Sequence, residues 1–250
     1  MNRLPLLATL IVIAVNAAAN ILPINGVQTG ELSARYPTGF TPAGWVFGIW
    51  SLIYVGLLAF SVHMARNPAA LTARARRVVA PYLVSCAGNA AWIFAWHYEQ
   101  IAASFAFMLV ILGGLLTAYV RLRADAPGSF AERACVDAPF SLYLGWITTA
   151  TLANLAALFF DLGVYPFGLA MDDWALLTVV TATGIYAAAG ARTGDAIYTA
   201  VFAWAALGIV LQTLEISEPV RLAAAAGCAV ALVATAVSLL PATGRGVARR

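Results

Sequence analysis

Long apolar stretches follow one another along almost the whole chain, and they constrain its fold more than any other feature. An apolar stretch of about twenty residues can cross a lipid bilayer as a helix. Because only 10% of the residues are charged and 62% are hydrophobic, the chain cannot cover itself with a soluble surface. We therefore predict an all-α polytopic helical bundle embedded in the lipid bilayer, with no soluble domain. Its eight spans are expected at residues 4 to 24, 45 to 65, 78 to 97, 101 to 120, 140 to 160, 174 to 191, 196 to 214 and 221 to 241.

The first stretch has a second interpretation, as a secretory signal. Arg3 precedes it, and the small residues of "NAAAN" are typical of a cleavage site. The apolar run continues past them into "ILPI", which is longer than an ordinary signal core. This length favours a membrane span that stays in the protein.

The distribution of arginine predicts the orientation of the spans, since short cytoplasmic loops are enriched in positive charge. An eight-span chain with its N-terminus inside has twelve arginines in inside segments and two, Arg35 and Arg221, in outside loops. A seven-span chain would instead put the tail with Arg245, Arg249 and Arg250 outside. We expect both termini in the cytoplasm of a bacterial-type inner (cytoplasmic) membrane. The basic balance is thus a topology signal, and we expect no nucleic-acid partner.

Aromatic and amide side chains recur at helical spacing in three of the spans. Residues at i, i+3 and i+7 share one face of a helix. Large flat rings with a few amides are typical of a pocket for a flat, mostly apolar ligand. The alternative is packing, in which tryptophans form interfacial belts and asparagines bond neighbouring helices. The stripes comprise Trp50 and Tyr54 in the second span, Asn89, Trp92 and Trp96 in the third, and Tyr143, Trp146, Ala150 and Asn154 in the fifth.

These stripes resemble the motifs of the TspO/MBR family, also called translocator protein or tryptophan-rich sensory protein. The family motif W-x-P-P followed by F-G-P-x-W-x-x-L-Y is similar to the segment from Phe40 to Tyr54. Its third-helix motif ends in N-x-x-W, as do Asn89 and Trp92, and its fifth-helix motif matches Tyr143 to Asn154. Departures are Phe40 for Trp, Ala43 for Pro, a residue missing between Gly48 and Trp50, Ser85 for Gln, and Leu142 for Pro. The cholesterol motif of animal members is also absent.

The resemblance implies a five-helix core over residues 1 to 161 and makes residues 162 to 250 an extension of three further transmembrane helices with a basic tail. It also implies that residues 25 to 44, hereafter the lid, fold over the mouth of a pocket, with Arg35, Phe40 and Pro42 in it. The implied ligand is a tetrapyrrole such as protoporphyrin IX, bound in sensing or transport. The pocket residues carried over are Trp50, Asn89, Trp92, Trp146 and Ala150, adjoined by Tyr54, Trp96 and Asn154.

Two other functions stay open. One is transport of another small apolar molecule, although the halves of the chain show no convincing repeat. The other is enzymatic degradation of the bound porphyrin, an activity proposed for some family members. The chain offers no nucleophile with its base, no carboxylate pair and no His/Cys cluster, so we expect no catalytic residues, metal or cofactor. Small residues at 223, 227, 231 and 235 would suit packing within the protein or a homodimer.

Overall fold

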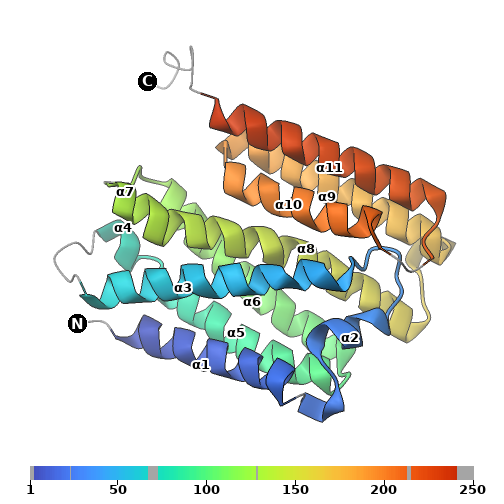
Figure 1. Cartoon of the computed structure of the whole chain (residues 1–250), viewed down its shortest axis with the longest axis horizontal. Helices are drawn as coiled ribbons and strands as arrows, with labels where there is room; N and C mark the ends of the chain where they lie inside the picture. The colour runs from blue at the N-terminus through green and yellow to red at the C-terminus, as the bar shows by residue number, and fades with distance from the viewer. Residues whose placement is uncertain (1–2, 23, 67–72, 128, 213–214, 241–250) are drawn as a thin grey trace.

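The computed structural model describes residues 3–22, 24–66, 73–127, 129–212 and 215–240 (Figure 1). Over these residues the secondary structure is helical and includes no strand. The all-α bundle predicted from the sequence is confirmed. Seven helices in the described part of the chain are long and apolar enough to cross a membrane.

Five long helices form the first part of the chain and pack into one bundle (Figure 1). α1 packs against α3 and α5, α5 against α6, α6 against α8, and α8 against α3. The approach of α6 to α5 requires Gly114, since a Cβ there would lie 2.7 Å from the carbonyl oxygen of Pro81. The five helices are α1 (Leu4–Ile21), α3 (Ile49–Arg66), α5 (Val79–His97), α6 (Ile101–Arg123) and α8 (Ala138–Leu162).

Short helices connect these long ones at both ends of the bundle. At one end lie η1 (Ile24–Gly26), α2 (Thr29–Ala34), η2 (Gly44–Gly48) and η4 (Pro166–Gly168). At the other end lie α4 (Ala73–Arg76), α7 (Phe130–Glu132) and the π-helical turn η3 (Arg133–Asp137). We call the first the lid end and the second the arginine end (Figure 1).

Three further helices form a layer that packs on α8: α9 (Met171–Thr193), α10 (Ala196–Val210) and α11 (Glu218–Leu239) (Figure 1). The predicted small-residue stripe at 223, 227, 231 and 235 faces the neighbouring helices, because Gly227 and Ala231 are buried, Gly227 lies against Thr183 and Phe202, and the Thr235 hydroxyl lies 2.8 Å from that of Thr199. This stripe therefore packs within the protein. The division into residues 1 to 161 and 162 to 250 stays a prediction.

α10 differs from the prediction of a full-length span over residues 196 to 214. It has 15 residues, fewer than the roughly twenty that a bilayer requires. Its C-terminal end, at Val210, is capped by the Arg221 guanidinium, whose Nη1 donates to the Val210 carbonyl at 2.6 Å. α10 nevertheless runs alongside α9 and α11 from one end of the layer toward the other, so it reverses the direction of the chain as the longer helices do. As a result, the start of α1 and the end of α11 both lie at the arginine end (Figure 1).

Buried polar contacts join the added layer to the first five helices. The Asp195 carboxylate accepts hydrogen bonds from the Tyr119 hydroxyl at 2.8 Å and from the Ser141 hydroxyl at 2.6 Å. It also caps α10 by accepting from the backbone N–H groups of Ile197 and Tyr198. The sequence analysis did not identify this carboxylate, which is only 6% exposed.

The arginine end holds a buried ion cluster. Arg74 is 5% exposed and pairs with Glu132 at 3.3 Å and with Asp137. Its Nε also donates to the Leu122 and Asp125 carbonyls, so one guanidinium joins α4 to the end of α6 and to the connection between α6 and α8. The basic tail used to predict the orientation, after residue 240, lies outside the described residues.

Candidate functional site

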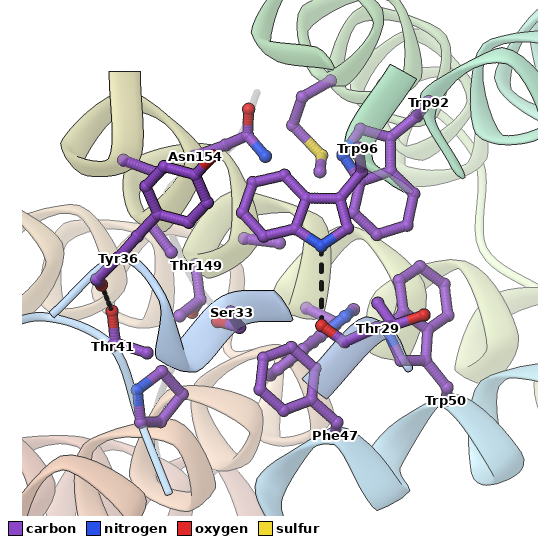
Figure 2. Close-up of a pocket in the computed structure, with 16 residues that line it drawn as sticks. Thr29, Ser33, Tyr36, Thr41, Phe47, Trp50, Trp92, Trp96, Thr149 and Asn154 are labelled. Atoms are coloured by element: carbon purple, nitrogen blue, oxygen red, sulfur yellow. Dashed lines mark hydrogen bonds between the residues drawn. The ribbon is translucent and has the colours of Figure 1, made fainter. Parts of the chain in front are cut away.

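A cavity lies beneath the lid, between α3, α5 and α8 (Figure 2). The lid contributes residues of α2 and the segment with Pro42, the turn η2 contributes Phe47, and α6 contributes Met108. The lining residues are Thr29, Ser33, Tyr36, Thr41, Pro42, Phe47, Trp50, Trp92, Trp96, Met108, Trp146, Thr149, Ala150, Ala153, Asn154 and Ala157. The cavity thus gathers residues from four long helices and the lid.

Four tryptophans line the cavity. Trp50 stacks on Trp92, with ring centroids 6.0 Å apart, and Trp92 stacks on Trp96 at 6.3 Å. Trp146 meets Trp50 edge to face at 6.2 Å. Three rings in nearly parallel stacks and one at a right angle present both flat faces and an edge, which suits a planar apolar ligand.

Two of these tryptophans have unused hydrogen-bond donors. The indole N–H groups of Trp92 and Trp146 are buried and have no hydrogen-bond partner among the described residues. A buried donor without a partner costs about 1–3 kcal/mol. An acceptor on a bound ligand would remove that cost.

The first half of the lid is fastened to the end of α5. His97 is fully buried, and its Nε2 lies 2.9 Å from the Thr29 hydroxyl while its Nδ1 lies 3.0 Å from the Ile24 carbonyl oxygen. Trp96 donates from its indole nitrogen to the Thr29 carbonyl at 3.5 Å (Figure 2). His97 therefore serves as a structural hydrogen-bonding residue of the lid.

The second half of the lid is bonded to α10 and to Gln212, just beyond the end of that helix. The Ala43 N–H donates to the Gly208 carbonyl at 3.1 Å, and the Gln212 amide donates to the Thr41 carbonyl at 3.1 Å. The Trp204 indole donates to the Val46 carbonyl at 3.0 Å. The lid is therefore held in part by α10, a helix outside the five-helix core that the sequence motifs imply.

The structure brings together six of the eight ligand-binding residues predicted from the sequence. Trp50, Trp92, Trp96, Trp146, Ala150 and Asn154 line the cavity under the lid, although their ligand-binding role stays a prediction. Asn154 accepts a hydrogen bond from Ser104 at 3.2 Å. Its position at the cavity wall is therefore held from α6.

The other two residues do not line this cavity. Tyr54 lies in a cleft between α1 and α3. Asn89 is fully buried behind that cleft, where its Oδ1 accepts from the Asn16 amide at 2.7 Å and its amide donates to the Tyr143 hydroxyl at 3.1 Å. Asn89 thus joins α5 to α1 and α8.

Of the three predicted lid residues, one lines the cavity. Pro42 does so, whereas Phe40 is fully buried in the core. Arg35 forms an ion pair with Glu99, with 2.9 Å between Nη1 and Oε1, and both side chains are largely exposed. Its guanidinium is therefore held at the lid surface.

Sequence analysis missed the lid residues that close the cavity, namely Thr29, Ser33, Tyr36 and Thr41. Tyr36 packs on Trp96 with ring centroids 5.5 Å apart. Burial and the nearby charges of Glu99 and Asp161 raise the pKa of Tyr36 to about 12. A tyrosine directly before a proline in a span-connecting loop, as Tyr36 is before Pro37, was the one available signal for it.

The cavity has a free volume of about 50 Å³. Since one water occupies about 30 Å³, this space is far smaller than a tetrapyrrole. A ligand of that size requires the lid and the tryptophans to move apart. Within the described residues there is no group of three His, Cys, Asp or Glu that could hold a metal ion.

The family model described as TSPO-like protein matches residues 3–237. The chain belongs to the TSPO-like protein family. The match continues through α9 and α10 and almost to the end of α11, farther than the motifs recognised in the sequence. No curated protein and no solved structure matched the TSPO-like chain.

Family membership and the seven apolar helices in the described part of the chain establish this TSPO-like protein as an integral membrane protein in contact with lipid. In general terms, the family indicates a membrane protein that binds or senses tetrapyrroles. The specific ligand is a matter for the geometry of the site.

Proposed function

We propose that this protein binds a planar tetrapyrrole of the protoporphyrin IX type beneath the lid and acts in its sensing or transport. The observation that carries the proposal is the pair of unpartnered indole N–H groups, of Trp92 and Trp146, in a wall of four tryptophans. A tetrapyrrole offers a large flat face for stacking and polar atoms that accept hydrogen bonds. A purely hydrocarbon ligand would satisfy the rings and leave both donors without partners.

The arrangement of the wall supports a planar ligand in particular. Trp50, Trp92 and Trp96 form a series of nearly parallel rings, and Trp146 stands edge to face against Trp50, so a flat ring that enters the cavity can align with the series. Asn154 adds an amide at the edge of the cavity. Ala150 and Ala153 leave room between them, because neither projects beyond its Cβ.

We also propose that the lid faces away from the cytoplasm. Arg74, Arg77, Arg121 and Arg123 cluster at the arginine end, opposite α2. Cytoplasmic ends of membrane proteins carry such an excess of arginine. The cavity would then open toward the outer side of a bacterial inner membrane.

Titration of the detergent-solubilised protein with protoporphyrin IX, followed by tryptophan quenching, tests the binding proposal. We expect saturable binding that is lost in the double variant Trp50→Leu and Trp146→Leu. A double variant at Trp45 and Trp174, which lie outside the cavity, removes the same number of tryptophans and should retain binding. Equal, non-saturating quenching in all three proteins would refute the proposal.

A further inference from the structure

A second hollow lies beside the cavity, in a cleft between α1 and α3 under the first part of the lid. It has a free volume of about 450 Å³, much larger than that of the cavity. Its lining includes Asn16, Asn20, Ser51 and Tyr54, together with Trp50 and Thr29. Asn20 and Ser51 are exposed, so the cleft opens to the side of the bundle.

The open side of this cleft faces the lipid. α1 and α3 are both candidate spans, and Val55, one turn from Ser51 on α3, is an exposed apolar side chain. Asn16 is five residues from the end of α1, which is about 7.5 Å along the helix axis. The cleft therefore lies within the outer part of the membrane at the lid end.

Several polar atoms in the cleft have no partner within the described residues. The Asn16 side chain is 4% exposed, and its amide nitrogen donates to the Val12 carbonyl and to Asn89, but its Oδ1 accepts no hydrogen bond. Asn20 donates to the Asn16 carbonyl and likewise leaves its Oδ1 free. The hydroxyls of Tyr54 and Ser51 also have no hydrogen bond there.

Free polar atoms at membrane depth are costly, because lipid tails cannot bond them. Packing alone would favour apolar residues at these positions. The cleft is instead suited to a molecule that has both an apolar body and a polar edge. Trp50 supplies an aromatic wall, since it stacks on Tyr54 with centroids 5.6 Å apart.

Only one layer of side chains separates the cleft from the cavity. Thr29, Phe47, Trp50 and Trp92 line both hollows. Of these, Trp50 is only half-buried, so it has room to turn on the cleft side. Movement of this indole would join the two hollows without detaching the lid.

The lid itself offers a more difficult route. Its first half is bonded to His97 and Trp96, and its second half to Gly208 and Gln212. Entry of a ligand through the lid end, with the whole lid lifted off the bundle, must break both sets of bonds. A passage between α1 and α3 leaves the second set intact.

We infer that the α1–α3 cleft is the membrane-side entrance of the site, where an amphipathic planar ligand is taken directly from the bilayer. This inference rests on the proposed function. The polar edge of the ligand bonds the free groups of Asn16, Asn20, Ser51 and Tyr54, and the ring then passes Trp50 into the cavity. The cleft is thus a first binding position as well as a route.

Binding kinetics test this inference in lipid nanodiscs, with protoporphyrin IX as the probe and its own fluorescence as the signal. Ser51→Trp narrows the cleft from α3. We expect the association and dissociation rate constants to fall together by about tenfold or more, with Kd unchanged within about twofold, because blocking a route does not alter the bound state. Val55→Trp, one turn along α3 and 66% exposed, is the matched control and should keep both rates.

Ala17→Trp narrows the same cleft from α1 and should slow both rates in the same way, which guards against a folding defect in α3. Unchanged rates in both cleft variants would overturn the inference and place the route at the lid. A weaker Kd with an unchanged association rate would overturn it too, because the cleft would then be only part of the bound site. Absence of saturable binding by the unaltered protein would instead refute the proposed function.

Discussion

The indole nitrogen of Trp204 donates a 3.0 Å hydrogen bond to the backbone carbonyl of Val46, which is 158 positions away in the chain. Trp204 also meets Trp45 edge to face, with centroids 4.6 Å apart. These contacts connect α10 to the turn that leads from the lid into α3. The added layer thus takes part in holding the site closed, and the stability of the lid depends on residues beyond the five-helix core.

Trp204→Phe should loosen the lid, because it keeps an aromatic ring and removes the hydrogen bond to Val46. A net loss of about 1 kcal/mol corresponds to roughly fivefold faster opening. Hydrogen exchange of the Ala43 amide, measured by mass spectrometry, is expected to accelerate by that factor. Trp174→Phe removes a comparable indole bond, to the Pro166 carbonyl outside the lid, and should leave this exchange unchanged.

Gly208→Ala should disturb the same junction by steric conflict. A Cβ at position 208 would collide with the Val46 side chain and lie 3.2 Å from the Pro42 Cβ. Such overpacking costs about 1–3 kcal/mol, so we expect a lower Tm and faster exchange in the lid. Gly184→Ala meets nothing within 4 Å and should be neutral or more stable, by up to about 1 kcal/mol from its helix propensity. Equal effects of the two changes would contradict this account.

Asp195→Ala should detach the added layer from the core. The change removes the cap of α10 and leaves the Tyr119 and Ser141 hydroxyls without their acceptor. We expect a loss of about 3 kcal/mol, measured by thermal unfolding in detergent. Asp172→Ala, at an exposed position in the first turn of α9, is the control and should cost well under about 1 kcal/mol. A small effect at Asp195 would show that the remaining contacts hold the layer to the core without this carboxylate.

Trp146→Phe should weaken tetrapyrrole binding about five- to tenfold, because the ring stays and the unpartnered N–H is lost. Porphyrin absorbance avoids interference from the changed tryptophan count. Trp45→Phe removes an indole N–H outside the cavity and should bind normally. Retention of full affinity by Trp146→Phe would mean that this donor does not contact the ligand.

Alkaline pH should weaken the closed lid through Tyr36. Burial and the charges of Glu99 and Asp161 raise its pKa to about 12, so the closed lid favours the neutral phenol. The contribution of Tyr36 is fully present below its ordinary pKa of about 10 and is lost as the pH rises from there to about 12. Absorbance titration at the tyrosinate band should show one late-titrating group fewer in Tyr36→Phe than in the unaltered protein. A difference that titrates near pH 10 would contradict a buried phenol in the lid.

The sequence by itself determined the helices and the main aromatic stripes. Apolar length sets the spans, and the spacing of Trp92 and Trp96, or of Trp146 and Ala150, fixes a shared face of one helix because helical geometry is local. Those residues do line one cavity. The family resemblance also predicted a lid over this cavity. Within the lid, however, the Phe40 side chain is buried in the core and Arg35 forms an ion pair with Glu99.

Only the tertiary structure decided what each stripe faces and what holds the lid. In a membrane protein the outer and inner faces of a helix are both apolar, so periodicity does not reveal which one is buried. Asn89 illustrates this, because its spacing matches Trp92 but its partner is Asn16 on α1. The bond from Gln212 to the lid and the bond from Trp204 to the turn after it join distant parts of the chain, and they form because packing brings α10 beside this segment.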